Sequence, residues 1–302
     1  MVKIIDAIEL CNERVKELQQ KVYSLNNTFR KLQFCIINAS DDKGNERYIQ
    51  NKIKLAEEIG IDAIVHKFDK DCTDDDILKL INECNEKWCP VILQLPIYEH
   101  LDKEKLLDAI DYMVDADGFT REWIGEVNLG NDELVCPATP KGVISLLKYH
   151  NIDLQGKNVL VIGSSNHVSK PLLSMILKRG GTILNANINT QDLNSLIRIS
   201  DVIISCVGKP NLIKPEVIKD GCVLIGVGFT YIDRKQILDF DIDEIVKDGR
   251  ASIVTNRINC TGKTTVLSLM ENVITLYQIY WSRHMQDSCV TSFKQTIDRG
   301  IK

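Results

Sequence analysis

The sequence predicts a two-domain α/β protein built on parallel β-sheets. Short apolar runs that suit buried strands alternate along the chain with segments of helical spacing, and this alternation occurs twice. The chain of 302 residues is also long enough for two ordinary hydrophobic cores. Strands that are joined by helices run parallel, and the helices cover the faces of the sheet.

The first series occupies the first half of the chain. It opens with an amphipathic helix, because apolar residues recur three and four positions apart from Ile8 to Val22. A later helical segment stops at Gly60, a residue suited to the positive φ that follows many helices. The expected strands are 32–38, 61–68 and 89–96, and the expected helices are 45–60 and 74–87.

The second series follows a proline-punctuated helix at 137–151, which we interpret as the bridge between the domains. A last helix at about 262–281 has one apolar face. The expected strands of this series are 157–166, 181–187, 201–208, 222–229 and 251–256.

Composition excludes several classes of function. The net charge of -5 and the absence of a long basic run give no electrostatic footprint for nucleic acid or an anionic membrane. The ten cysteines are scattered without a C-x-x-C pair, so we expect neither a disulfide framework nor a metal site. No run approaches the roughly 20 apolar residues that span a bilayer. We therefore expect a cytoplasmic protein that acts on small molecules.

Turns of small residues at strand ends indicate a nucleotide site. Gly163, Ser164 and Ser165 directly follow an apolar strand and precede a helix, where backbone N–H groups can approach a phosphate. Small residues also close the next two apolar strands, the first of them at Val207 and Gly208. Each turn could equally be a tight connection without a ligand. Several of them at the carboxyl ends of parallel strands favour a binding site.

Four polar residues in the first half are candidates for catalysis. Tyr48 and Lys52 lie four residues apart on one helical face, and a lysine in a dry site can act as a base. Gln94 at a strand end and Asp115 beside a glycine could bind a ring that bears N–H groups. Solvated helix positions and ordinary turns would use the same residue types.

The order of these motifs resembles that of the bifunctional methylenetetrahydrofolate dehydrogenase/methenyltetrahydrofolate cyclohydrolase family, known as FolD-like proteins. The resemblance spans nearly the whole chain, and the motifs occur in the family's order and approximate spacing. They are Y-x-x-x-K (48–52), V-I-L-Q-L-P (91–96), D-x-D-G-F (115–119), P-x-T-P-x-G (137–142), V-I-G-x-S (161–165) and V-G-K-P (207–210).

The resemblance implies a fold of two α/β domains that flank a cleft. An N-terminal catalytic, folate-binding domain would comprise residues 1–140 together with a C-terminal helix at about 262–302. A Rossmann-like dinucleotide-binding domain would comprise residues 141–261. The family also implies a homodimer.

The implied activity is the oxidation of 5,10-methylenetetrahydrofolate with NADP, followed by hydrolysis of the methenyl product to 10-formyltetrahydrofolate. NAD is the other possible cofactor. By resemblance Lys52 is the catalytic lysine, Tyr48 stacks on the folate and Gln94 positions the lysine. The further implied site residues are Asp115 on the pterin; Leu93, Leu95, Asn259 and Gly262 around the substrate; and Gly163, Ser164, Ser165, Val207, Gly208 and Phe229 at the dinucleotide.

Several positions depart from the family pattern. The segment 258–263 stands where the family has a loop of the form P-G-G-V-G-P, and Ser169 replaces a glycine. Val114 replaces a lysine that is frequent in the family, and Ser164 stands where some relatives bind a ribose 2′-phosphate through arginine. These departures leave open a degenerate paralogue without dehydrogenase activity, with a binding role or cyclohydrolase activity only. Another Rossmann-type oxidoreductase is a third possibility.

Overall fold

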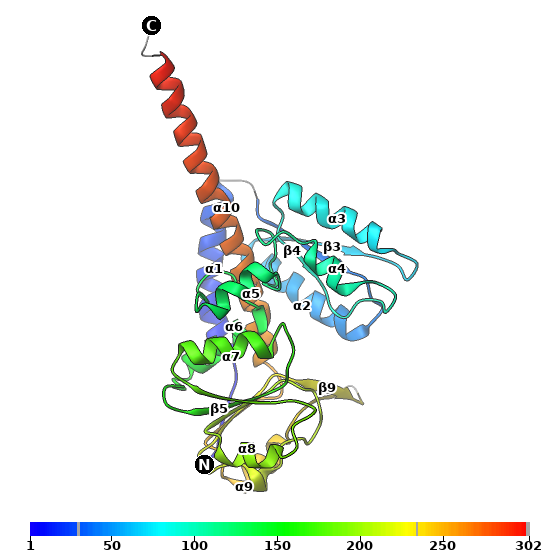
Figure 1. Ribbon diagram of the computed structural model, residues 1–302, viewed down its shortest axis with the longest axis vertical. Coiled ribbons are helices and arrows are strands. Elements are labelled where there is room, and N and C mark those ends of the chain that lie inside the picture. The colour runs from blue at the N-terminus through cyan, green and yellow to red at the C-terminus, as the bar shows by residue number, and fades with distance from the viewer. Residues whose placement is uncertain (29–30, 234, 300–302) are drawn as a thin grey trace. The chain divides into compact units, whose positions relative to one another are not determined.

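The computed structural model describes residues 1–28, 31–233 and 235–299, and its backbone packs as two compact units (Figure 1). One unit, here the six-strand unit, contains residues 1–17 and 121–269. The other, the three-strand unit, contains residues 18–120 and the chain from residue 270 onward. The predicted functional division at residues 140 and 261 stays a prediction, and its last residues, 300–302, lie outside the described residues.

The three-strand unit is a parallel sheet with helices packed on it. Its central strand is β2 (Gln33–Asn38), which pairs with β3 (Asp62–Lys67) on one side and β4 (Val91–Leu93) on the other. All three strands were predicted at the right places, although β4 is shorter than expected. The helices are α1 (Ile8–Thr28), whose second half belongs to this unit, α2 (Lys43–Ile59), α3 (Asp74–Lys87), α4 (Lys103–Asp108) and α10 (Thr261–Arg299), which belongs to this unit from residue 270 onward.

Side-chain hydrogen bonds fix the ends of α2 and α3. The Asp42 carboxylate accepts a hydrogen bond from the backbone N–H of Asn45 and so caps α2, which ends at Gly60 with φ 88°. Thr73 and Asp76 form a reciprocal capping box at the start of α3. The predicted boundaries of both helices are therefore confirmed to within two residues.

Alternation along β2 and β4 separates the two faces of this sheet. Cys35 and Ile37 of β2 and Val91 and Leu93 of β4 pack with the apolar side chains of α3 and α4. The intervening residues of both strands belong to the opposite face, which α2 covers with Ile49, Ala56 and Ile59. The carboxyl ends of β2 and β4 on this opposite face carry polar residues.

The six-strand unit is an all-parallel sheet in the order β1-β11-β8-β7-β5-β6. An antiparallel hairpin of β9 (Phe229–Ile232) and β10 (Lys235–Leu238) accompanies it. The strands are β1 (Lys3–Ile5), β5 (Asn158–Ile162), β6 (Thr182–Ala186), β7 (Val202–Ser205), β8 (Val223–Gly226) and β11 (Ile253–Thr255). The helices are α5 (Arg121–Asn128), α6 (Ala138–Tyr149), α7 (Ser169–Lys178), α8 (Leu193–Ile199), α9 (Ile242–Asp248) and a 3₁₀ turn, η1 (Pro215–Val217).

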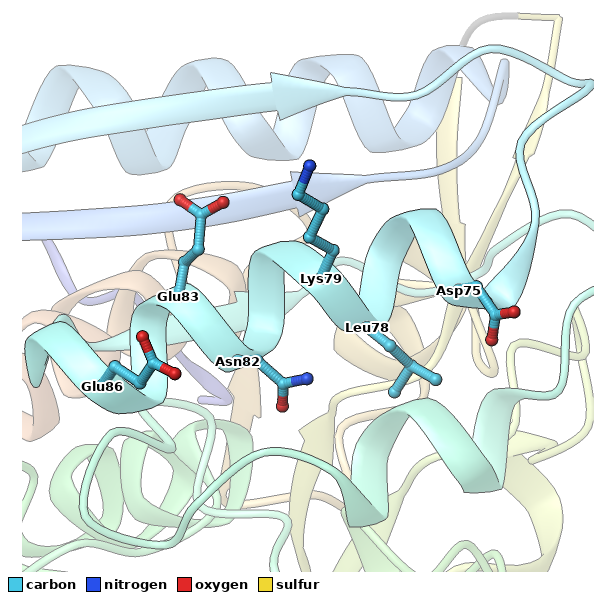
Figure 2. Close-up of a pocket in the computed structure, with 6 residues that line it drawn as sticks. All are labelled: Asp75, Leu78, Lys79, Asn82, Glu83 and Glu86. Atoms are coloured by element: carbon cyan, nitrogen blue, oxygen red, sulfur yellow. The ribbon is translucent and has the colours of Figure 1, made fainter.

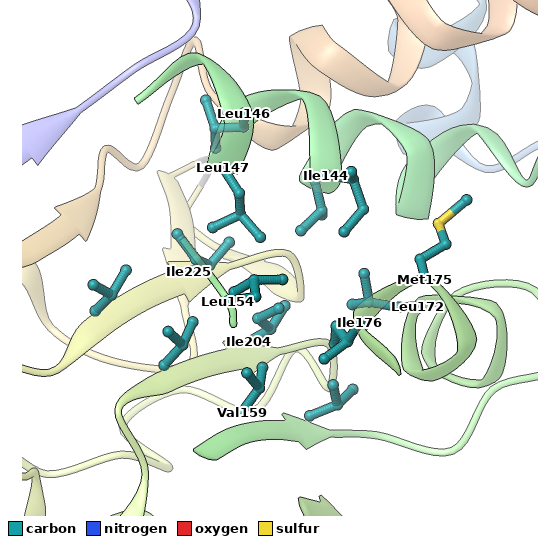
Figure 3. Close-up of a cluster of buried hydrophobic side chains, with 14 of the residues drawn as sticks. Ile144, Leu146, Leu147, Leu154, Val159, Leu172, Met175, Ile176, Ile204 and Ile225 are labelled. Atoms are coloured by element: carbon teal, nitrogen blue, oxygen red, sulfur yellow. The ribbon is translucent and has the colours of Figure 1, made fainter. Parts of the chain in front are cut away.

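Both faces of this larger sheet are covered, as the continuous apolar strands predict. Val159 and Val161 of β5 belong to a core cluster with α6 and α7, whereas Leu160 and Ile162 belong to a cluster with α8 and α9. Figure 3 shows the first cluster, in which side chains of α6 and α7 point toward Ile204 and the neighbouring strands. The two-domain α/β class with parallel sheets is confirmed.

Several elements differ from the sequence expectation. The helix at 137–151, interpreted as the bridge between the domains, corresponds to α6 and lies within the six-strand unit. The strand β1 was not predicted, and it adds the start of the chain to the six-strand sheet beside β11. The run 222–229 was predicted as one strand, but β8 ends at Gly226 and Phe229 begins the hairpin. The last helix extends to Arg299 rather than to residue 281. Among the described helices none combines the length and hydropathy needed to cross a membrane.

Ile204 is fully buried at the centre of the cluster in Figure 3. We expect Ile204→Ala to lower the free energy of unfolding by about 2–5 kcal/mol, because the truncated side chain leaves a cavity. Urea unfolding followed by circular dichroism measures this change. The control Ile188→Ala removes a side chain that is 93% exposed and should cost less than about 0.5 kcal/mol. Equal losses in the two variants would contradict this description of the core.

Candidate active site

The predicted catalytic lysine is buried and hydrogen-bonded to the predicted glutamine. Lys52 lies on the sheet-facing side of α2, and Gln94 directly follows β4. The Lys52 Nζ donates a hydrogen bond to the Gln94 Oε1 at 2.8 Å, and both side chains are no more than 9% exposed. Two residues 42 positions apart in sequence thus form one buried polar pair.

The remaining hydrogen bonds of this pair fix the orientation of the Gln94 amide. The Gln94 Nε2 donates to the carbonyl oxygen of Leu95 at 2.9 Å and to the Asn45 Oδ1 at 3.3 Å. The Asn45 Nδ2 in turn donates to the carbonyl oxygen of Pro96 at 2.8 Å. Because a lysine amine offers donors and Gln94 Nε2 already has two acceptors, only the Oε1 can face Lys52. Asn45 was not predicted as part of the site.

Burial changes the protonation behaviour of Lys52. Removal from water disfavours the ammonium and lowers the pKa of Lys52, and the negative charge of Asp117 partly offsets this shift. Burial likewise raises the pKa of Asp117, and the charge of Lys52 opposes that rise. The two groups therefore lie close enough to influence each other electrostatically. Lys52 is thereby available as a neutral amine at lower pH than a solvated lysine.

Asp115, the acid singled out in the sequence, occupies a different position from Asp117. Its Oδ1 accepts a hydrogen bond from the backbone N–H of Gly118 at 2.9 Å, and its Oδ2 accepts one from Thr120 at 2.7 Å. Burial raises the pKa of Asp115 to about 6, against the effect of these hydrogen bonds. Asp115 thus holds together the turn that carries Asp117. The sequence signal for Asp117 was the second acid of the D-x-D-G motif.

The other predicted substrate residues of the three-strand unit lie beside the same group. Tyr48 is partly buried one helical turn before Lys52 on α2. Leu93 is fully buried at the end of β4, and the partly buried Leu95 follows Gln94. Lys52, Gln94, Asp117 and Tyr48 therefore form a candidate catalytic group at the carboxyl ends of parallel strands.

The predicted dinucleotide turn follows β5 in the six-strand unit. Gly163 has φ 139°, and a Cβ there would lie 2.6 Å from the Ser169 Oγ and 3.3 Å from Cys206. Only glycine fits this position. Ser164 and Ser165 are exposed. The Ser165 Oγ accepts hydrogen bonds from the backbone N–H groups of Val168 and Ser169, which begin α7.

A buried aspartate that was not predicted holds the second turn. Asp239 follows β10 and is fully buried. Its carboxylate accepts hydrogen bonds from the Ser205 hydroxyl and from the backbone N–H groups of Val207 and Lys209. Burial raises the pKa of Asp239, and these hydrogen bonds counteract the rise.

Glycines allow the hairpin to approach this turn closely. Gly208 has φ 75°, and a Cβ on it would lie 2.8 Å from the carbonyl oxygen of Phe229. A Cβ on Gly228 would lie 2.4 Å from the backbone nitrogens of Val207 and Gly208. The turn with Val207 and Gly208 and the hairpin with Phe229 therefore form one packed structure in the six-strand unit.

The two remaining predicted residues lie before and at the start of α10. Asn259 is exposed, has φ 57°, and accepts a hydrogen bond from the backbone N–H of Ala7 through its carbonyl oxygen. Gly262 is an exposed residue of the first turn of α10. Both belong to the six-strand unit, as do Gly163 and Val207.

A surface hollow beside α3 does not involve any of these residues. Figure 2 shows that the side chains lining it all come from α3, and none of them belongs to the Lys52 group. They are Asp75, Leu78, Lys79, Asn82, Glu83 and Glu86. No group of metal-ligating side chains is assembled within the described ranges.

Comparison with known proteins identifies the family. Residues 5–117 match the catalytic domain of tetrahydrofolate dehydrogenase/cyclohydrolase, and residues 137–280 match its NAD(P)-binding domain. The chain is 36% identical over 280 residues to the bifunctional protein FolD of Lactobacillus acidophilus, a match that covers 91% of this chain and 97% of that protein. The chain belongs to this family.

Solved structures of the dehydrogenase/cyclohydrolases share the fold. The bifunctional FolD enzyme of Campylobacter jejuni is 31% identical, with a TM-score of 0.88 over 93% of this chain and 100% of that chain. A 5,10-methylenetetrahydrofolate dehydrogenase from the silkworm Bombyx mori is 30% identical, with a TM-score of 0.84 over the same shares of the two chains. The predicted family resemblance is confirmed.

Asp239 accepts hydrogen bonds from three donors of the 205–209 turn. We expect Asp239→Asn to lower the free energy of unfolding by about 2–4 kcal/mol, because its Nδ2 would face N–H donors. Urea unfolding measures the loss. The control Asp220→Asn changes an exposed acid in the same unit and should cost less than about 0.5 kcal/mol. An Asp239→Asn variant as stable as the control would refute this role.

Proposed function

We infer that the protein oxidises 5,10-methylenetetrahydrofolate to 5,10-methenyltetrahydrofolate with NADP and hydrolyses the product to 10-formyltetrahydrofolate. The chain belongs to the dehydrogenase/cyclohydrolase family along both of its matched domains. The single observation that carries the hydrolytic half is the buried hydrogen bond between Lys52 and Gln94. The Lys52 amine is neutral at lower pH than a solvated lysine, and Asp117 can stabilise the positive charge of Lys52 after proton transfer.

The hydrolysis needs a base that removes a proton from water. Water adds to the methenyl carbon, and the lone pair of the neutral Lys52 Nζ takes the proton. The Gln94 Oε1 holds one N–H of the amine, which directs the lone pair away from the amide. The resulting ammonium is stabilised by Gln94 and by the charge of Asp117. The proton then passes to N5 of the folate as the bond from N5 to the former methenyl carbon breaks, and the hydroxyl on that carbon releases its remaining proton to solvent as it becomes the formyl carbonyl.

Dinucleotide binding is assigned to the six-strand unit. Gly163 lets the backbone turn tightly after β5, and Ser164 and Ser165 are exposed beside it. Val207, Gly208 and Phe229 lie at the neighbouring turn. These residues fit a dinucleotide, because backbone can approach a phosphate closely at such a strand-end turn. The bound nicotinamide supplies the hydride acceptor. The protein's part in this step is to orient the ligands and to exclude water.

NADP is the proposed cofactor, with NAD as the alternative. The matched family domain binds NAD(P), which covers both. The Ser164 side chain offers a hydroxyl rather than a cation to a ribose 2′-phosphate. Parallel assays with the two dinucleotides separate these possibilities.

Roles of the remaining site residues are proposals as well. Tyr48 would stack on the folate ring, with Leu93 and Leu95 around the substrate near Gln94. We assign to Asp117 the recognition of the pterin that the sequence suggested for Asp115, because both oxygens of Asp115 hold its own turn. Asn259 and Gly262 are proposed to contact the substrate from the start of α10.

The domain division, the localisation and the oligomeric state are also proposals. The folate-binding domain would comprise residues 1–140 with the C-terminal helix from about 262, and the dinucleotide-binding domain residues 141–261. We propose a cytoplasmic homodimer that takes part in one-carbon metabolism, without nucleic-acid or membrane partners. The comparisons do not favour the alternative of a degenerate paralogue, because relatives named for both activities match nearly the whole chain.

Substitution of Lys52 separates the two activities. We expect Lys52→Met to abolish hydrolysis of methenyltetrahydrofolate, because methionine cannot accept a proton, while hydride transfer is largely retained. Absorbance assays follow the methenyl product and the reduced dinucleotide. The control Lys54→Met removes an exposed lysine of the same helix and should leave both rates within about twofold. Undiminished hydrolysis in Lys52→Met would remove the proposed role of Lys52, and no turnover by the wild-type protein would remove the proposed function.

A further inference from the structure

Asn38 is a buried polar residue next to the candidate catalytic group. It is the last residue of β2 and only 3% exposed. Its backbone carbonyl oxygen accepts a hydrogen bond from Phe68, so the main chain is fixed. No described residue, however, donates a hydrogen bond to its Oδ1. A buried acceptor without a partner is unfavourable in a folded protein, so this oxygen needs a donor that the described residues do not supply.

The strand register places this amide beside Gln94. Ile36 pairs with Ile92 and Ile37 with Leu93, so the next residues of the two parallel strands, Asn38 and Gln94, are neighbours. Strands lie about 4.8 Å apart, and paired residues point to the same face. Asn38 therefore belongs to the face that α2 covers, where Gln94 holds Lys52.

The side-chain amides of the surrounding group donate to other acceptors. The Gln94 Nε2 donates to Leu95 and Asn45, and the Asn45 Nδ2 donates to Pro96. An N–H from outside the protein is then the natural partner of the Asn38 Oδ1, since an amide oxygen selects a donor. The substrate of the proposed reaction carries N–H groups on its pterin ring.

We propose that Asn38 is a further substrate-binding residue, whose side-chain oxygen accepts a hydrogen bond from an N–H group of the folate beside Lys52 and Gln94. This inference rests on the proposed function. It adds a specificity-determining contact from β2 to those from α2 and β4. A substrate without a donor at that place would leave the buried oxygen unpaired, and the site would discriminate against it.

Two apolar variants, Asn38→Leu and Asn38→Val, test the proposal. Leucine has nearly the shape of asparagine, and valine suits a strand. We expect the KM for methenyltetrahydrofolate to rise about 5- to 10-fold, as for the loss of one neutral hydrogen bond, with kcat within about twofold. The melting temperature should not fall, because an amide oxygen without a partner adds nothing to the folded state. If Asn38 had only a structural role, both variants would melt at a lower temperature and keep the wild-type KM.

Asn85→Ala is the matched control. The Asn85 amide donates to the carbonyl oxygen of Ala109 and accepts from Asp111 on the α3 side of the sheet. Its loss should lower the melting temperature and leave the KM unchanged. Steady-state hydrolysis rates at several pH values and thermal unfolding are measured for all four proteins.

Three results would overturn the proposal. An unchanged KM in the apolar variants would exclude the contact with substrate. A shift of the pH profile at constant KM would instead make Asn38 a positioning residue for Lys52. Failure of both variants to fold would show that the amide has a structural partner. Because the wild-type protein is assayed alongside, absence of wild-type turnover would count against the proposed function rather than against Asn38.

Discussion

The buried hydrogen bond between Lys52 and Gln94 is the interaction on which the chemistry of this protein depends. A lysine amine is costly to bury, and the cost falls on its charged form. Here α2 delivers the amine to the end of β4, where an amide oxygen rather than a carboxylate receives it. A neutral acceptor in contact keeps the free amine accessible, whereas a contacting carboxylate would have stabilised the ammonium.

Other features of the three-strand unit serve to keep this pair in place. Asn45 and the backbone of Leu95 take up the amide hydrogens of Gln94, so the amide cannot turn its nitrogen toward the lysine. Both oxygens of Asp115 accept hydrogen bonds from the backbone of its own turn, and the turn fixes Asp117 near the Lys52 amine. In the six-strand unit, Asp239 has a role like that of Asp115: it is a buried acid whose carboxylate accepts hydrogen bonds from a strand-end turn and fixes the shape of that turn.

Periodicity in the sequence was sufficient to predict most of the elements. The apolar runs and helical spacings are properties of neighbouring residues, and caps such as Thr73 and Gly60 mark where helices begin and end. The strand β1 was missed because its three residues lead almost directly into α1, so that no separate apolar run marks it. The family resemblance supplied Lys52 and Gln94 as partners, since their pairing joins two distant segments that no local pattern connects.

The parts of the site that the sequence did not supply are those that depend on register and contact. The two acids of D-x-D-G look alike in sequence, and only their hydrogen bonds distinguish Asp115 from Asp117. Asn38 reads as the end of an apolar strand until the register with β4 places it beside Gln94. Asp239 is remote in sequence from the turn that it holds.

Direct titration of the Lys52 side chain tests the central claim most directly. The ¹³Cε chemical shift is followed against pH in protein with labelled lysine, and Lys52→Met identifies the signal. We expect a pKa of Lys52 below the ordinary 10.5, and a still lower pKa of Lys52 in Asp117→Asn, because the charge that favours the ammonium is removed. Hydrolysis should correspondingly slow as pH falls through the wild-type value. A Lys52 that titrates at 10.5 or above would contradict the account.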